Sequence, residues 1–155
     1  MSRAFVKEPD GSEPFTDAPE KQVSQHPNYV TANGLALIEA EVARLTLESS
    51  IAQTSGDRAA LSATARDLRY WQARRASADV VPPPSHTAVV QFGSTASIAR
   101  EDGRRQVFRI TGEDEANPAQ GSISYVSPLA RALMGKSVGE VIRLGAAEVE
   151  IVAIE

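Results

Sequence analysis

Two runs of residues with helical spacing, separated by a glycine, constrain the fold of this chain most strongly. The first run advances in alternating steps of three and four through Leu35, Ile38, Val42, Leu45, Ser49 and Ala52. The second run keeps the same steps through Leu61, Thr64, Leu68, Trp71, Arg75 and Ala78. This spacing places each run on one stripe of a helix. Because Gly56 and Asp57 lie between the runs, we predict two antiparallel helices of about 20 residues, each extending roughly 30 Å, joined by a tight turn.

Prolines mark both boundaries of this predicted hairpin. Three consecutive prolines at positions 82–84 cannot continue a helix and form a stiff boundary on the C-terminal side. Upstream, residues 1–28 combine prolines and charged residues with little apolar material, which predicts an extended or disordered tail. We therefore expect three segments: a tail over residues 1–28, a helical hairpin over 29–81 and a second domain over 82–155.

Beyond the prolines the apolar pattern changes to a period of two, which is typical of strands. Short strands are predicted over residues 88–92, 95–100, 106–111, 122–126, 141–144 and 149–154. One short helix is predicted over residues 128–134, with Ser127 as its cap and Pro128 in its first turn. The chain is therefore predicted to be an α+β protein, with an N-terminal antiparallel α-helical hairpin (a short coiled coil) followed by a small, mostly antiparallel sheet that carries one helix.

The composition excludes several classes of site. The 155 residues include no cysteine, which excludes disulfides, thiolate metal sites and cysteine nucleophiles. The two histidines, His26 and His86, stand near prolines in predicted loops, and we interpret them as linker residues rather than metal ligands. No apolar run reaches the roughly 18 to 20 residues of a membrane span, and the first residues form no hydrophobic signal region. We therefore expect a cytoplasmic protein with no membrane contact, no bound metal and no cofactor of its own.

Charge is unevenly distributed along the chain. The net charge of −4 is not that of a protein that binds nucleic acid by neutralising phosphates. Arginines nevertheless outnumber acids in the second predicted helix, at positions 58, 66, 69, 74 and 75. We interpret them as a solvated helix face paired with acids of a neighbouring helix. Contact with an acidic protein surface or with RNA is the alternative.

The sequence contains no simple catalytic template, such as a phosphate-binding glycine loop or a Gly-x-Ser-x-Gly elbow. Glu113, Asp114 and Glu115 follow Gly112 and fit a solvated turn; a divalent-cation site is the alternative, although consecutive acids in a strand point to alternating faces. Ser127 has no candidate base beside it in sequence, so a helix cap is favoured over a nucleophile.

Three segments of the second predicted domain occur in a characteristic order: FGS at residues 92–94, RITGEDEA at 109–116 and SPLARALMGKSVGE at 127–140. In this order and spacing they resemble the C-terminal domain of the Gre transcript-cleavage factors (GreA/GreB). The opening residues 2–8, SRAFVKE, and residues 29–31, YVT, resemble the GreB-like branch of that family.

This resemblance implies a fold, a partner and a role. Gre-type proteins pair a coiled-coil hairpin with an FKBP-like C-terminal domain, which docks on bacterial RNA polymerase at the rim of the secondary channel while the hairpin enters the channel. Two carboxylates at the family's hairpin tip help hold a second magnesium ion in the polymerase active site, so that water can cleave backtracked RNA. The resemblance thus implies a monomeric accessory factor that is not itself an enzyme. Its partner is RNA polymerase, with indirect contact to RNA in the polymerase channel.

The predicted tip departs from the family pattern. The family's tip reads Gly-Asp-x-x-Glu-Asn; Gly56 and Asp57 match its first acid, but Ala60 stands where the second acid belongs. Each arm is also about eight to ten residues shorter than in the family, which removes roughly 12 to 15 Å of reach. Asp57 is therefore only a weak candidate for a metal contact, and a turn or cap residue is favoured. Reduced arms also resemble the Rnk-type members, which dock without stimulating cleavage.

The docking surface implied by the resemblance is the loop before the short helix, which meets a polymerase coiled coil in the family. Ser127, Pro128 and Leu129 fall on this loop and are the predicted partner-binding residues. Val126 stands where one branch of the family carries an acid, so a charge-assisted bond would be missing there.

We therefore predict a Gre-type transcription elongation regulator that docks at the secondary channel through its C-terminal domain and that is not expected to stimulate cleavage. One alternative is an active transcript-cleavage factor in which Asp57 supplies a metal contact. A second alternative is an FKBP-like peptidyl-prolyl isomerase, which fold alone supports weakly. The aromatic residues of the second domain are few, namely Phe92, Phe108 and Tyr125.

Overall fold

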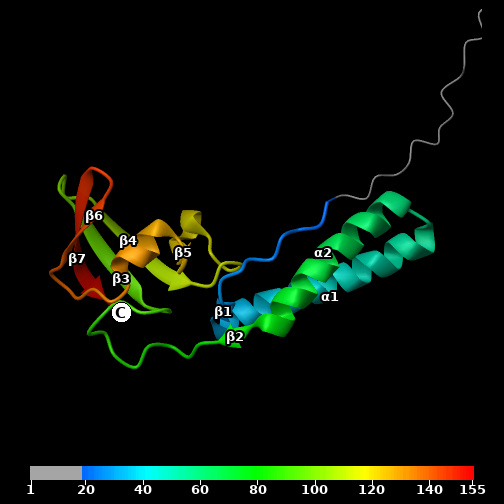
Figure 1. The fold of residues 1–155 in the computed structure, drawn as a ribbon, viewed down its shortest axis with the longest axis horizontal. Helices are drawn as coiled ribbons and strands as arrows, with labels where there is room; N and C mark the ends of the chain where they lie inside the picture. The colour runs from blue at the N-terminus through cyan, green and yellow to red at the C-terminus, as the bar shows by residue number, and fades with distance from the viewer. Residues whose placement is uncertain (1–18) are drawn as a thin grey trace, which may run out of the picture.

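A helical hairpin projects from one end of a small curled sheet, and the two parts meet at the base of the hairpin (Figure 1). The computed structural model describes residues 19–155. Predictions for residues 1–18 lie outside this range. Residues 19–28, the described part of the predicted tail, form no helix or strand and contact the second hairpin helix.

The hairpin consists of α1 (Ala32–Ser55) and α2 (Arg58–Ser77). Thr31 caps α1 by accepting the Gly34 N–H at 3.0 Å, and α1 ends at Gly56, whose φ of 71° is left-handed and favours glycine. The two helices have 24 and 20 residues, so they extend about 36 Å and 30 Å. The predicted antiparallel hairpin is therefore confirmed.

The residues that α1 buries in the seam between the helices are those that the spacing predicts, whereas α2 buries a different residue near its C-terminal end. Ile38, Val42 and Leu45 are buried on α1, as the spacing predicts. Near the C-terminal end of α2 the prediction is wrong, because Arg75 is exposed and its neighbour Arg74 is 1% exposed. The reason is that this end of α2 faces the second domain, which offers carboxylates rather than an apolar stripe.

A short parallel pair of strands closes the base of the hairpin. β1 (Tyr29–Val30) pairs with β2 (Asp79–Val80). Two backbone bonds extend this pairing, from the Asp79 N–H to the Asn28 carbonyl and from the Val81 N–H to the Val30 carbonyl, both at 2.9 Å. The two ends of the hairpin therefore leave it side by side.

The second domain is a five-stranded sheet in the order β5-β4-β3-β7-β6. Its strands are β3 (Thr95–Arg100), β4 (Arg105–Thr111), β5 (Ser122–Ser124), β6 (Val141–Leu144) and β7 (Ala147–Ile154). The predicted, mostly antiparallel sheet is confirmed, and its one parallel pair is that of β5 with β4. After β4 the chain does not turn back in a hairpin; residues 112–121 cross over through the short 3-10 helix η1 (Pro118–Gln120) and re-enter in the same direction.

The predicted short helix is confirmed as α3 (Pro128–Leu133). Its Ala130 and Leu133 pack on the inner face of the sheet, in a core that also contains Ile98, Ile110 and Ile151. The predicted strand over residues 88–92 is wrong: Val90 instead exchanges backbone bonds of 2.8 Å with the turn after α3. A curled sheet around one helix is compatible with the FKBP-like fold that the resemblance implies. Within residues 19–155, no helix combines the length and apolar character needed to cross a membrane.

Candidate functional site

Asp57, the acid predicted at the tip of the hairpin, caps the start of α2. The Asp57 carboxylate accepts the Ala60 N–H at 3.0 Å, which satisfies one of the free donors at the start of α2. Asp57 is exposed, and Ala60 presents a methyl group where a second acid would be needed. Within residues 19–155, no group of three His, Cys, Asp or Glu side chains is arranged to hold a metal ion.

The predicted docking residues lie on the loop that leads into α3. Ser127 caps this helix by accepting the Ala130 N–H at 3.3 Å, and Pro128 is exposed in its first turn. Leu129 is half-buried and packs against the domain core. The Val126 N–H donates to the Ser124 hydroxyl at 3.2 Å. Pro128 is therefore the most accessible of the four predicted residues, while Leu129 also has a packing role.

Tyr125 ties this loop to the base of the hairpin. Its hydroxyl donates to the Pro27 carbonyl, and its ring lies 5.4 Å from Tyr29 and 5.8 Å from Phe92, measured between centroids. Desolvation raises the pKa of the Tyr125 hydroxyl. Phe92 and Tyr125 thus close against the hairpin, and nothing in this arrangement favours the isomerase alternative, which stays a prediction.

A buried ion pair joins the two domains, and the sequence did not predict it. The Arg74 guanidinium donates from Nε to Asp114 Oδ2 at 2.5 Å and from Nη2 to Asn28 Oδ1 at 2.7 Å. The side chains of Arg74 and Asp114 are only 1% and 9% exposed. Glu113 Oε2 lies 3.6 Å from Arg74 Nη2 and is buried with no hydrogen-bond partner. We call Asn28, Tyr70, Arg74, Glu113 and Asp114 the joint network.

Tyr70 and Asn28 complete the joint network. The Tyr70 hydroxyl donates to Asp114 Oδ1 at 2.5 Å, so both oxygens of that carboxylate are satisfied. Burial, followed by this hydrogen bond, raises the pKa of Tyr70 to about 12. The Asn28 amide donates to the Arg74 carbonyl at 2.7 Å, near the end of α2 where carbonyls lack helical partners.

Glu115 makes a second bridge between the domains. Its carboxylate accepts the Thr31 hydroxyl at 2.8 Å and the Thr31 N–H at 3.3 Å, at the start of α1. A carboxylate is stabilised by the positive end of the helix dipole there. Gly34 leaves room for this carboxylate, and Gly112 lets the Tyr29 carbonyl approach the turn, since a Cβ at either position would overlap its neighbour.

The three acids after β4, Glu113, Asp114 and Glu115, were predicted to form a solvated turn or a divalent-cation site. The structure shows a different role for them, which is to join the second domain to the hairpin. Asp114 and Glu115 are bound to the hairpin base, so the solvated-turn interpretation is wrong and no cation site forms at them. The sequence gives no local signal for this ion pair, because Arg74 and the acidic run are about forty residues apart and only the folded chain brings them together. These residues fix the direction in which the hairpin projects from the second domain.

The arginines of α2 pair mainly with acids outside the neighbouring helix. Arg69 binds Glu20 of the N-terminal segment, Arg74 binds Asp114 of the second domain and Arg66 binds Asp67 beside it. The predicted pairing with acids of a neighbouring helix is therefore wrong for these three arginines, because their acids lie in the N-terminal segment, in the second domain and in α2 itself.

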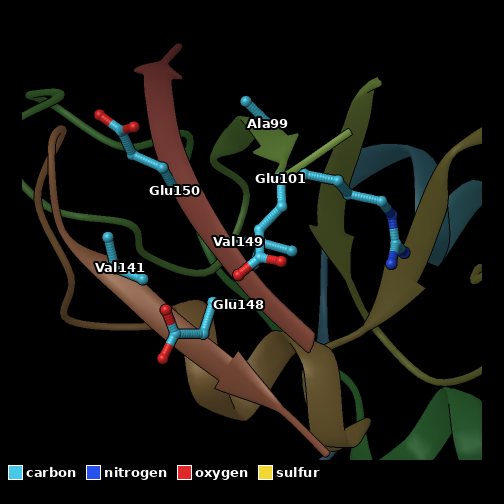
Figure 2. Close-up of a pocket in the computed structure, with 7 residues that line it drawn as sticks. Ala99, Glu101, Val141, Glu148, Val149 and Glu150 are labelled. Atoms are coloured by element: carbon cyan, nitrogen blue, oxygen red, sulfur yellow. The ribbon is translucent and has the colours of Figure 1, made fainter. Parts of the chain in front are cut away.

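A hollow of about 190 Å³ lies over β6 and β7 on the sheet and is lined in part by Glu101, Glu148 and Glu150 (Figure 2). Glu148 is paired with Arg143 at 3.3 Å. Figure 2 shows the three carboxylates at separate points around the hollow rather than converging on one centre. This arrangement gives no cation site.

Comparison with known proteins identifies the class of the chain. Residues 85–155 match the family model described as "Transcription elongation factor, GreA/GreB, C-term". The transcription elongation factor GreA of Chloroflexus aggregans is 32% identical over 138 residues, which cover 75% of this chain and 87% of that protein. GreA of Helicobacter hepaticus is 37% identical over 117 residues, which cover 67% and 71%.

The second domain thus matches the C-terminal domain of the GreA/GreB family, as the sequence motifs predicted. The long matches to two GreA proteins extend this to most of the chain, which belongs to the GreA/GreB family.

Other matches are more limited. GreB of Neisseria meningitidis serogroup B is 40% identical over 96 residues, which cover 58% of this chain and 59% of that protein. The chain therefore spans about three fifths of the length of this relative. The crystal structure of GreA factor homolog 1 (Gfh1) of Thermus thermophilus superposes with a TM-score of 0.41 at 20% identity, over 84% of this chain and 99% of that one.

Proposed function

We propose that this chain binds RNA polymerase at the secondary channel through its C-terminal domain and that its hairpin does not stimulate transcript cleavage. The observation that carries the proposal is the chemistry of the tip. Asp57 is engaged as the cap of α2, and Ala60 stands where the family has its second acid. Holding a second magnesium ion requires oxygen ligands at about 2 Å, and this tip offers one carboxylate where the family offers two.

The length of the hairpin supports the same conclusion. Helix α1 has 24 residues and α2 has 20. The resemblance of the sequence to the family implies that each arm is about eight to ten residues shorter than the family's. At 1.5 Å per residue, a hairpin seated at the same rim would end roughly 12 to 15 Å short of the family's tip position. A metal ligand cannot act across such a gap, because coordination fails within a few tenths of an ångström.

The short hairpin is still long enough to occupy the mouth of a channel. We therefore propose that the chain competes with longer Gre factors for the same docking place. The exposed Pro128 and the neighbouring Val126 are the proposed contact points for the polymerase coiled coil, and Tyr125 and Ser127 hold their loop in place.

Two measurements with the full chain test this proposal. In the first, the chain is added to RNA polymerase carrying a labelled GreA, and displacement of the label is followed. In the second, it is added to stalled elongation complexes and the length of the transcript is followed. We expect displacement without cleavage. No displacement at any concentration would refute the docking, and shortened transcripts would favour the active-factor alternative.

Two substitutions at one position separate the cap role of Asp57 from a metal role. Asp57→Asn keeps an N-cap oxygen, because asparagine caps helices as well as aspartate does, but it removes the anionic ligand. Asp57→Ala removes both. We expect Asp57→Asn to match the wild type in stability and in transcription assays, and Asp57→Ala to lose about 1 kcal/mol of unfolding free energy. A transcription defect shared by both variants would assign Asp57 a metal contact instead.

The docking loop has its own test. Val126→Asp restores the acid that one branch of the family carries, so we expect tighter polymerase binding through a charge-assisted bond. Val107→Asp introduces the same change at an exposed position on β4, with 54% of that residue accessible, and is the matched control. Equal effects of the two substitutions would place the docking surface elsewhere.

A further inference from the structure

The outer face of the five-stranded sheet carries no helix within residues 19–155. Core residues such as Ile98, Ile110 and Ile151 point to the inner face, on which α3 packs. Since side chains alternate along a strand, the residues between them on β3, β4 and β7 point outward. Helices α1 and α2 project from one end of the sheet (Figure 1). The central strands therefore present an outer surface that a partner can reach.

The strand register places an arginine and a glutamate in one row of this outer face. Ala99 of β3 lies opposite Arg105 of β4 on one side and opposite Glu150 of β7 on the other. Both charged residues are exposed, and within residues 19–155 neither side chain forms an ion pair or a hydrogen bond. Adjacent strands lie about 4.8 Å apart, so the Cα atoms of Arg105 and Glu150 are about 10 Å apart, with only the methyl group of Ala99 between them.

Two further rows repeat this arrangement. The β3 residues at the centre of the three rows are all small, namely Thr95, Ser97 and Ala99. In the second row, Val107 of β4 and Ala153 of β7 lie on opposite sides of β3. In the third row, Arg109 and Glu155 lie on opposite sides of β3. The β4 side of the face is therefore basic and the β7 side acidic, with a strip of small residues between them.

A face with this pattern is complementary to a second copy of itself. A two-fold axis that runs along β3, midway between two facing sheets, places β4 of each copy over β7 of the other. This rotation keeps the rows in register, so Arg105 of one copy faces Glu150 of the other, and Val107 faces the small Ala153. Facing sheets pack about 10 Å apart, which an arginine and a glutamate side chain together can bridge.

The acidic side of the face also has space for the arginine of a second copy. The hollow of about 190 Å³ on the sheet is lined by Ala99, Glu148 and Glu150, among others (Figure 2). Its carboxylates stand apart, which does not suit a metal ion. A guanidinium group is larger and planar, and it spreads its N–H donors in several directions, so it can bind carboxylates that do not converge.

The size of the outer face limits the strength of such a pair. Five strands are together about 24 Å wide, and the six residues of β3 extend about 20 Å. The face therefore offers about 500 Å² per copy, or about 1,000 Å² for two copies, which is near the lower limit of specific interfaces. We expect a weak and reversible association, because exposed ion pairs contribute little each.

We propose that two copies of this chain associate through the outer faces of their sheets, about a two-fold axis along β3, with β4 of each copy over β7 of the other. The resemblance to the family implies a monomer, so this pair is an addition to it. Helix α3 lies on the inner side of the sheet, so the pair leaves the docking loop accessible. Polymerase binding is measured at dilutions at which so weak a pair dissociates, and Val107→Asp therefore remains a control for that loop.

Sedimentation equilibrium of the full chain measures this association. We expect the wild type to dimerise with a Kd of the order of 100 µM at low salt. Arg105→Glu places acid against acid and should raise the Kd at least about tenfold. Arg75→Glu makes the same change at an exposed position of α2 and should leave the Kd unchanged. A wild type that stays monomeric up to about 1 mM, or equal effects of the two substitutions, would overturn the proposal.

Mixing two variants tests the predicted geometry. Arg105→Glu and Glu150→Arg each give a face on which both positions carry the same charge, so each variant alone should be monomeric. In a mixture every contact joins an acid to a base, and we expect the two variants to associate at least about tenfold more tightly than either does alone. Arg75→Glu mixed with Glu39→Arg, both at exposed positions of the hairpin, should show no such gain. Failure of the first mixture to associate would overturn the proposal.

A rival surface for self-association gives a distinct result. Leu47 and Ile51 of α1 are 64% and 60% exposed and lie one helical turn apart. Dimerisation that survives Arg105→Glu and is lost in Leu47→Gln would assign the contact to the hairpin and overturn the proposal. None of these measurements involves RNA polymerase, so their outcome is independent of the docking proposed above.

Discussion

Replacing Arg74 by methionine tests whether the joint network holds the two domains together. The methionine keeps much of the apolar stem, but it leaves Asp114 and Glu113 facing each other without a cation, with side chains 9% and 22% exposed. It also removes the 2.7 Å bond to Asn28. Removing one partner of a buried ion pair costs about 3 to 5 kcal/mol, because the other charge stays buried and uncompensated. We expect a loss of unfolding free energy in that range.

The neighbouring residue offers a matched control. Arg75→Met makes the same chemical change one position later, where the side chain is exposed, so we expect a loss below about 0.5 kcal/mol. Unfolding in urea is followed by circular dichroism for the helices. The fluorescence of Trp71, the single tryptophan, reports on the region next to Tyr70. Coincident transitions from both signals justify a two-state treatment.

A double-mutant cycle attributes the loss to the pair itself. Asp114→Asn alone leaves the Arg74 charge buried, whereas Arg74→Met with Asp114→Asn removes both charges. We expect the double variant to be more stable than the sum of the single losses predicts, with a coupling of about 1 to 3 kcal/mol. Equal unfolding free energies for Arg74→Met and Arg75→Met would refute the role assigned to the joint network.

Further predictions concern the same joint. The pKa of Tyr70 is raised from 10.0 to about 12, so the folded chain holds this proton more tightly than the unfolded chain; stability should therefore fall as pH rises from 10 through 12, and Tyr70→Phe should remove one late step from the tyrosinate absorbance titration. Gly34→Ala should displace the Glu115 carboxylate from Thr31 and lower the unfolding free energy by about 1 kcal/mol or more. Gly112→Ala should cost more than Gly34→Ala in the same urea experiment, because its Cβ meets a backbone carbonyl that cannot rotate away.

The sequence predicted the elements whose stability is local. The seam of α1 is visible because Ile38, Val42 and Leu45 repeat at helical spacing against one continuous partner. The caps at Asp57 and Ser127 were predicted for a similar reason, since each cap accepts an N–H only three residues away. Local signals of this kind need no knowledge of the distant chain.

The errors lie where a partner is distant in sequence. Arg74 breaks the apolar pattern of α2 because its partner is Asp114, forty residues away. The direction of β5, which the prediction of a mostly antiparallel sheet left open, depends on the crossover of residues 112–121 and not on the alternation within the strand. Residues 88–92 have strand-like alternation, but the chain there bonds to the turn after α3 through Val90 alone. Propensity indicates what a segment can form, and tertiary contacts decide what it does form.

Asp114 and Glu115 lie at the base of the hairpin, where they can control the direction in which it points. A rod about 36 Å long turns an error of 10° at its base into a displacement of about 6 Å at its tip. Asp114 and Glu115 are bound at the base, to Arg74 and to Thr31, and these bonds limit such an error. The tip, by contrast, carries Asp57 as a cap and no second acid at position 60. If the hairpin acts by occupying a channel, as proposed, its direction has to be fixed while its tip chemistry does not. Loosening the joint should then weaken competition with a longer factor even when the docking loop is intact.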